Sequence, residues 1–204
     1  MIGFYNYTVI VTYLGVAVSV LGIGLAMSGN LTAAVICLMF SGLCDAFDGP
    51  IARTKGNRTE DEKRFGIQLD SLQDIICFGV LPAAIGFGLG MRGRGPTLVL
   101  MAYVLAGLTR LAYFNVTEET RQDQTDERRT EYVGLPITSA ALVLPLIYGF
   151  HRYLSTHKMV LVYGATLICL ALAFLARVRF KKIHGWGIMM LVFGGLLELV
   201  WVLF

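Results

Sequence analysis

Charged residues are scarce in this chain. Only 15% of the 204 residues are Asp, Glu, Lys or Arg, whereas about 25% is usual in soluble domains. Hydrophobic residues make up 56%, and the mean hydropathy is +0.67. The composition therefore excludes an ordinary soluble domain and indicates an integral membrane protein. The net charge of +3 adds little, and no nucleic-acid partner is expected.

Sulfur and imidazole ligands are scarce too. The four cysteines form no C-x-x-C pair, and none of the three histidines has ligand spacing to another His or Cys. A zinc site of the common kind is excluded, because it needs such ligands. The cysteines all lie in apolar segments, where we expect small packing residues. They are Cys37, Cys44, Cys77 and Cys169.

Apolar sequence, by contrast, is abundant. A helix needs about 20 apolar residues to cross the hydrocarbon core, and seven runs approach that length. They are Thr8–Met27, Leu31–Ile51, Ile67–Gly90, Thr97–Val116, Leu135–Phe150, Met159–Ala176 and Trp186–Phe204. The fifth is short and contains two prolines, so its limits are poorly defined. We predict an all-α polytopic membrane helix bundle with about seven transmembrane helices, in which residues 1–204 form one domain. The first run has no basic segment before it and no A-x-A site after it, so we expect a mature helix, not a signal peptide.

Lysine and arginine are distributed unevenly between the two sides of this predicted bundle. Twelve lie in the loops on one side and four on the other. Because such residues resist translocation, the richer side is predicted to face the cytoplasm, together with the amino terminus. Topology alone accounts for this bias, although anionic headgroups would also attract the same cations. We expect a location in the cell membrane.

Four aspartates interrupt two of the apolar runs. Each carboxylate at bilayer depth costs about 2.5–3.5 kcal/mol on insertion scales, so something must neutralise the four. Asp45 and Asp48 are spaced i, i+3, and Asp70 and Asp74 are spaced i, i+4, which places each pair on one helix face. Two facing helices would bring all four together.

Converging carboxylates suit Mg²⁺ or Mn²⁺, because both prefer oxygen ligands. Two such ions about 3.5–4 Å apart can hold phosphoryl oxygens for in-line displacement, so phosphate chemistry is favoured. A structural cluster or a cation pathway is the alternative, since intramembrane carboxylates also line transporters. A transporter would predict inverted repeats and broken helices, and the sequence displays neither.

The residues around the aspartates form two spaced blocks. The chain reads D-x-x-D-G-x-x-A-R from Asp45 to Arg53 and G-x-x-x-D-x-x-x-D from Gly66 to Asp74, with twelve residues between the blocks. This pattern resembles the signature of the CDP-alcohol phosphatidyltransferase family, whose connection here is usually shorter. Longer surface loops are tolerated at small cost. The resemblance implies a membrane enzyme with a six-helix catalytic core that replaces CMP on a nucleotide-activated lipid with an alcohol.

The resemblance also assigns roles to the aspartates. Asp45, Asp48 and Asp70 would be ligands of two Mg²⁺ or Mn²⁺ ions, and Asp74 would take the proton of the attacking hydroxyl and also touch a metal. The alcohol oxygen would attack the lipid-side phosphorus of CDP-diacylglycerol directly, and CMP would leave.

Other motif positions would bind the CDP-lipid. Gly49, Ala52 and Gly66 would leave room for a nucleotide or for close helix packing. Arg53 would donate a fork of hydrogen bonds to phosphate. By resemblance, Thr59 would contact phosphate or ribose. Two residues near the start would lie close to the cytidine, although helix capping is the alternative for them. They are Asn6 and Thr8.

Flanking residues bear on the acceptor alcohol. L-D-S-L-x-D at Leu69–Asp74, F-G-V-x-P at Phe78–Pro82, R-L-A-x-F-N-V at Arg110–Val116 and G-L-P at Gly134–Pro136 resemble the phosphatidylserine synthase branch. Serine is the predicted acceptor, and Arg110 would hold its carboxylate or a lipid phosphate; pairing with a motif aspartate and snorkelling are the alternatives. A sister enzyme using glycerol 3-phosphate or inositol phosphate remains a second hypothesis.

The lipid tails stay open between diacyl and isoprenoid chains. Membrane lipids and a second copy, in a homodimer, are the other expected partners. The G-x-x-x-G at Gly86 and Gly90 fits either a dimer contact or packing within one chain.

Overall fold

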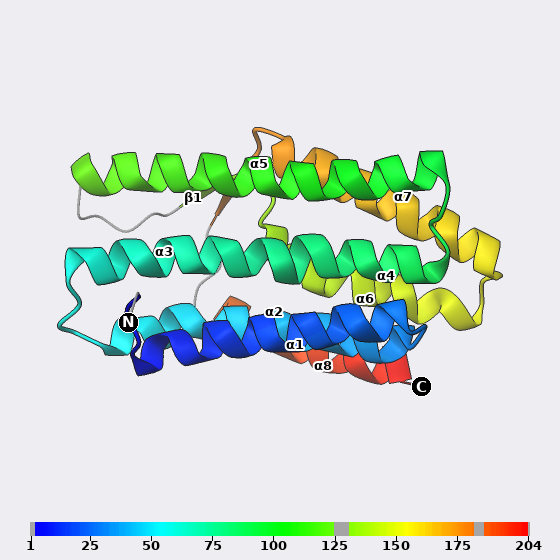
Figure 1. Ribbon diagram of the computed structural model, residues 1–204, viewed down its shortest axis with the longest axis horizontal. Coiled ribbons are helices and arrows are strands. Elements are labelled where there is room, and N and C mark those ends of the chain that lie inside the picture. Colours follow the sequence, from blue (N-terminus) through cyan, green and yellow to red (C-terminus); the bar gives the residue numbers. More distant parts are fainter. Residues whose placement is uncertain (1–2, 125–130, 182–185, 204) are drawn as a thin grey trace.

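The computed structural model describes residues 3–124, 131–181 and 186–203. Seven helical segments run alongside one another in a bundle (Figure 1). They are α1 (Ile10–Met27), α2 (Leu31–Thr54), a composite of α3 (Glu60–Asp74) and α4 (Leu81–Leu89), α5 (Arg94–Gln124), α6 (Ala140–Tyr148), α7 (Thr156–Leu175) and α8 (Trp186–Leu203). The predicted all-α membrane bundle is confirmed.

Five of these segments are long and apolar enough to cross a membrane. They are Tyr7–Met27, Leu31–Thr54, Glu60–Leu89, Arg94–Thr117 and Thr156–Leu175. The predicted fifth run, Leu135–Phe150, instead contains the nine-residue α6 between 3₁₀ turns at Ile137–Ser139 and Gly149–Arg152. The α-helical part covers only about 14 Å at 1.5 Å per residue, and the adjoining 3₁₀ turns extend the helical stretch to residues 137–152.

Two helices extend beyond the apolar limits that hydropathy suggests. α3 begins at Glu60, not Ile67, and α5 continues to Gln124. At the start of α3 the Thr59 hydroxyl accepts a hydrogen bond from the Glu62 amide, while the Glu62 carboxylate accepts one from the Thr59 amide. This capping box starts a helix in polar sequence because it satisfies amides that lack intrahelical partners.

A short β-pair accompanies the helices. β1 (Glu131–Val133) and β2 (Arg179–Lys181) are antiparallel, with Glu131 opposite Lys181. The pair links the segment after α5 to the segment after α7. With three residues in each strand, it leaves the all-α class unchanged.

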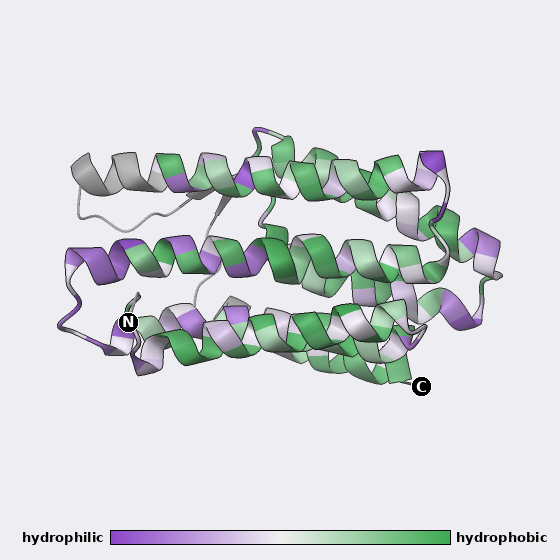
Figure 2. Ribbon diagram, viewed as in Figure 1, coloured by the Kyte–Doolittle hydropathy of each residue, from purple (hydrophilic) through white to green (hydrophobic). Residues whose placement is uncertain are grey.

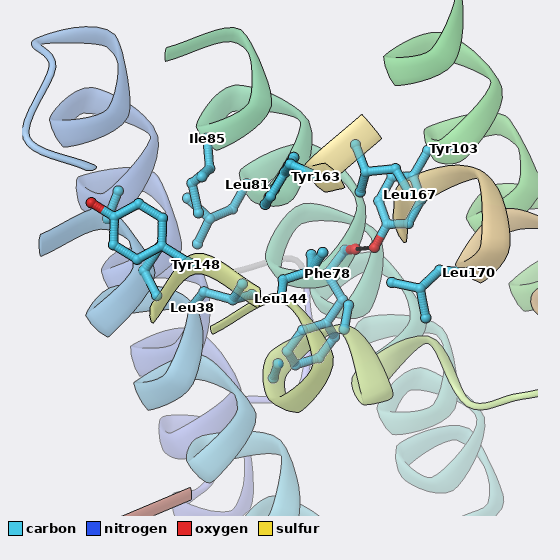
Figure 3. Close-up of a cluster of buried hydrophobic side chains, with 14 of the residues drawn as sticks. Leu38, Phe78, Leu81, Ile85, Tyr103, Leu144, Tyr148, Tyr163, Leu167 and Leu170 are labelled. Carbon is cyan, nitrogen blue, oxygen red and sulfur yellow. Dashed lines mark hydrogen bonds between the residues drawn. The ribbon is translucent and has the colours of Figure 1, made fainter. Parts of the chain in front are cut away.

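The composite third segment changes its hydrogen-bonding pattern in the middle. Residues Ile75–Val80 form a π-helical turn between α3 and α4, and this turn starts directly after Asp74. Pro82 follows and has no N–H to offer the carbonyl of Phe78, four residues earlier. The buried Tyr103 hydroxyl of α5 donates to that carbonyl at 2.7 Å (Figure 3), and the Tyr163 hydroxyl of α7 donates to the Pro82 carbonyl at 3.0 Å. Two distant helices thus support the backbone beside the second aspartate pair.

The glycines of the G-x-x-x-G pattern serve the fold of one chain. A Cβ atom added at Gly86 would lie 2.8 Å from Leu100 and 3.2 Å from Tyr163, so this glycine allows close packing inside the bundle. Gly90 has φ +108° and ends α4 in the left-handed conformation that glycine adopts at little cost. Packing at Gly86 and the helix end at Gly90 therefore account for the two glycines within one chain.

The Tyr103→Phe variant tests the support of the π-helical turn. It should lower the free energy of unfolding by about 1–3 kcal/mol, because the Phe78 carbonyl would be left buried without this donor. Thermal unfolding in detergent measures the change. The Tyr13→Phe variant, at a side chain that is 39% exposed, is the control and should unfold like the parent. Equal midpoints for the two variants would contradict the assignment.

Candidate active site

The four aspartates lie on the facing helices α2 and α3, toward the end of the bundle where these helices are connected. Asp45 and Asp48 belong to α2, and Asp70 and Asp74 belong to α3, of which Asp74 is the last residue. Hydrophilic residues gather along α3 toward its amino-terminal end (Figure 2). The predicted face-to-face arrangement of the two pairs is present.

Three of the carboxylates converge closely. One oxygen each from Asp45, Asp70 and Asp74 lie within 4.8 Å of one another. Asp48 stands outside this group of three, but its carboxyl is close enough to Asp70 to interact with it. Within the described residues, Asp48 Oδ2 and Asp74 Oδ1 are buried without hydrogen-bond partners. Oxygens bound to one Mg²⁺ at about 2.1 Å lie up to about 4.2 Å apart, a little less than the 4.8 Å limit of this group, so a small approach would let these hard, anionic donors hold a divalent cation.

A guanidinium group lies over each motif glycine. Arg53 turns back along α2, and its Nε donates to the Gly49 carbonyl at 3.1 Å. A Cβ atom at Gly49 would lie 3.4 Å from Nη2 of Arg53, and one at Gly66 would lie 2.7 Å from Nη2 of Arg58. Gly66 therefore makes room for Arg58, whereas the distance at Gly49 is that of an ordinary van der Waals contact. Ala52, which lies between Gly49 and Arg53 on α2, is half-buried.

Three polar residues that were predicted to contact the CDP-lipid also take part in capping local structure. Asn6 accepts a hydrogen bond from the Thr8 amide at 3.0 Å and another from its hydroxyl, so it caps the 3₁₀ turn Tyr7–Val9. Thr59 caps α3. These three side chains lie at the end of the bundle that carries the α2–α3 connection, and their contact with CDP-lipid stays a prediction.

Glu62 joins the amino-terminal segment, the α2–α3 connection and α3. Its carboxylate accepts hydrogen bonds from Lys55 Nζ at 2.6 Å and from the Thr59 amide at 3.1 Å, and a longer one from Asn6 Nδ2 at 3.5 Å. The motif T-x-x-E could have revealed this capping box, but the sequence interpretation treated Thr59 as a substrate contact. The inserted connection is therefore ordered by its own acidic residue.

On the other side of α3, polar side chains connect to α5. Ser71 donates to Asn115 Oδ1 at 2.8 Å, and Asn115 Nδ2 donates to Gln68 Oε1 at 3.3 Å. Arg110 lies on the same helix as Asn115 and is 9% exposed. Ser71 and Asn115, which were noted as branch markers in two separate segments, thus form one hydrogen-bonded pair beside the aspartates.

Gln73 is a residue that sequence reasoning missed. It stands between Asp70 and Asp74, is 1% exposed, and has no hydrogen-bond partner for either amide atom among the described residues. A Cβ atom at Gly15 of α1 would lie 3.1 Å from its Nε2. In the sequence, its i, i+3 spacing from Asp70 was the signal that could have identified it. Buried polar groups are rarely left unpaired, so this amide beside α1 is a further polar group whose partner the described residues do not supply.

The family model for CDP-alcohol phosphatidyltransferases matches residues 5–191. The chain belongs to this family. Both spaced blocks and all four aspartates fall within the matched residues. The acidic group of α2 and α3 accordingly agrees with the metal dependence that is general in the family.

Several curated relatives have similar sequences. CDP-diacylglycerol–serine O-phosphatidyltransferase of Saccharomyces cerevisiae is 42% identical over 110 residues, which are 52% of this chain and 38% of the relative. Archaetidylserine synthase of Methanothermobacter thermautotrophicus is 30% identical over 170 residues, covering 82% of this chain and 66% of the relative. The Helicobacter pylori CDP-diacylglycerol–serine O-phosphatidyltransferase is 30% identical over 195 residues, covering 92% and 78%. The chain thus spans less than two thirds of the first two relatives.

The Asp45→Asn variant tests the metal site. Binding of a ligand at 100 times its Kd stabilises a protein by about 2.7 kcal/mol, so Mn²⁺ should raise the unfolding midpoint of the parent. Asp45→Asn should lose this rise, yet its metal-free form should be at least as stable as the parent because repulsion among the carboxylates falls.

Thermal unfolding with and without Mn²⁺ measures both effects. The Asp61→Asn variant removes an exposed carboxylate from the first turn of α3, and it should respond to Mn²⁺ like the parent. An undiminished Mn²⁺ effect in Asp45→Asn would exclude that residue as a ligand.

Proposed function

We propose that this protein transfers the phosphatidyl group of CDP-diacylglycerol to the hydroxyl of L-serine, forming phosphatidylserine and releasing CMP. The convergence of Asp45, Asp70 and Asp74 between two membrane helices carries the proposal, since a member of this family needs a cation-binding centre for a diphosphate. The names of the relatives from yeast and H. pylori support serine as the acceptor. The archaeal relative, an archaetidylserine synthase, leaves the lipid tails open.

Four aspartates would hold the metal, which we take to be two Mg²⁺ or Mn²⁺ ions. The ligands are Asp45, Asp48, Asp70 and Asp74. When bound, these ions would neutralise charge on the diphosphate and on the departing CMP. The remaining proposed contacts to the CDP-lipid come from motif positions and from the cap residues. They are Asn6, Thr8, Gly49, Ala52, Arg53, Thr59 and Gly66.

Asp74 would serve as the general base. Its Oδ1 is buried and has no hydrogen-bond partner among the described residues, so this oxygen is available to accept the proton of the serine hydroxyl. The serine oxygen forms a bond to the lipid-side phosphorus, the bond from that phosphorus to the CMP oxygen breaks, and CMP takes the electron pair. No covalent enzyme intermediate is needed.

The acceptor site would lie between α3 and α5. Arg110 is the proposed partner of the serine carboxylate, since a guanidinium binds a carboxylate with two parallel hydrogen bonds. Ser71 and Asn115 connect the two helices at 2.8 Å, which supports a fixed distance between Arg110 and the aspartates. The polar end of the bundle would face the cytoplasm in the cell membrane, with membrane lipids around the helices, and a homodimer stays a prediction.

Acceptor specificity is tested with purified protein in detergent. CDP-diacylglycerol, Mg²⁺ or Mn²⁺ and one alcohol at a time are supplied, and CMP release is measured. Serine should give CMP and phosphatidylserine. Release with glycerol 3-phosphate or inositol phosphate but not serine would instead assign a sister activity, and no release with any acceptor would reject the family chemistry for this chain.

The role of Asp74 is tested by Asp74→Asn. Turnover should fall by about 10²–10⁴, the usual contribution of a general base, while CDP still binds in the presence of the metal. Single-turnover CMP release and CDP titration measure the two properties separately. Turnover close to that of the parent would remove Asp74 as the base.

A further inference from the structure

An arginine guanidinium lies next to each of the two motif glycines. Arg53 covers Gly49 on α2, and Arg58 covers Gly66 on α3, each through its Nη2 atom. Only Arg53 belongs to the recognised motif. Arg58 comes from the twelve-residue connection between the blocks, where the sequence analysis assigned a substrate contact to Thr59 alone.

The position of Arg58 is fixed by the start of α3. Its Nη2 donates to the Glu62 backbone carbonyl at 3.2 Å, and the Glu62 carboxylate holds Lys55 and the Thr59 amide. Arg58 therefore directly precedes the capping residue of a stable helix end. The guanidinium reaches Gly66 from a constrained backbone, so little conformational freedom is lost when it binds a ligand.

The two arginines differ from the neighbouring lysines in their ion pairs. The nearby lysines are paired, Lys55 with Glu62 and Lys63 with Glu60, both at 2.6 Å. Neither Arg53 nor Arg58 forms a salt bridge within the part of the chain that the structure describes.

The Nε atom of Arg58 adds a more specific observation. This atom is buried and has no hydrogen-bond partner within the described ranges. A buried guanidinium N–H without an acceptor is costly. An anionic ligand beside the Arg58 guanidinium would supply the missing acceptor.

We propose that Arg58 is a second phosphate-binding arginine, which with Arg53 holds the diphosphate of the nucleotide between α2 and α3. This inference rests on the proposed function only in requiring a CDP-linked substrate, not in requiring serine. Gly66 then serves to seat Arg58, because any side chain there would displace the guanidinium. The planar guanidinium fork suits phosphate oxygens, whereas a lysine supplies a point charge.

The test compares CDP with cytidine, which lacks phosphates, by titration of the full-length protein in detergent with Mg²⁺. Arg58→Gln should weaken CDP binding by about 10–100-fold, as expected for hydrogen bonds to a charged group, and leave cytidine binding unchanged. Arg58→Lys should lose part of this affinity. Lys63→Gln is the matched control, since it removes one positive charge near the start of α3 at a residue already paired with Glu60, and it should bind CDP like the parent.

A double variant tests whether Gly66 provides the space for Arg58. Gly66→Ala should weaken CDP binding to a similar degree as Arg58→Gln, and the two changes together should cost no more than either alone, because both remove one interaction. Additive losses would show that Gly66 acts independently of Arg58 and would overturn this part of the proposal.

The outcomes separate this inference from the proposed reaction. CDP affinity in Arg58→Gln equal to that in Lys63→Gln would overturn the role of Arg58, whatever acceptor the enzyme uses. Release of CMP with an alcohol other than serine would refute the proposed acceptor and leave Arg58 supported. A parent protein that binds no CDP would refute both.

Discussion

The burial of like charges between two helices is the constraint on which this structure depends. Asp48 and Asp74 are each less than 9% exposed, and three carboxylates approach within 4.8 Å. Such a group is unfavourable without a cation, because its members repel one another where little water can screen them. The fold must therefore hold α2 and α3 rigidly enough to keep the carboxylates together until a cation compensates them.

Several features of the bundle supply that rigidity. α3 is fixed at its start by the Thr59–Glu62 capping box. Beyond its end, Tyr103 donates to the Phe78 carbonyl of the π-helical turn and Tyr163 to the Pro82 carbonyl of α4. Small residues let the neighbouring helices approach, as at Gly22 of α1, where a Cβ would lie 2.8 Å from that of Cys37. Together these contacts restrict the movement of the helices that carry the aspartates.

Negative and positive side chains occupy separate parts of the site, an arrangement that suits a diphosphate lipid. The acidic group lies within the apolar part of α2 and α3, and the two arginines lie over the motif glycines. A nucleoside diphosphate bound there would meet the cation on one side and guanidinium groups on another. This arrangement also gives a reason for Gly66 that differs from the one the sequence suggested: it leaves space for the Arg58 side chain, in addition to any space for the nucleotide.

The amino-acid sequence by itself determined the membrane bundle, the two aspartate pairs and the family, because hydropathy and i, i+3 or i, i+4 spacing are local properties of the chain. It placed α6 and the start of α3 less well, since prolines, 3₁₀ turns and a capping box override apolar length there. Only the tertiary structure decided that Asp48 stands apart from the closest three carboxylates, that Ser71 meets Asn115 across 44 positions, and that Arg58 covers Gly66. Those relations depend on how helices pack and on where a polar loop folds back, and neither is encoded in any short stretch of residues.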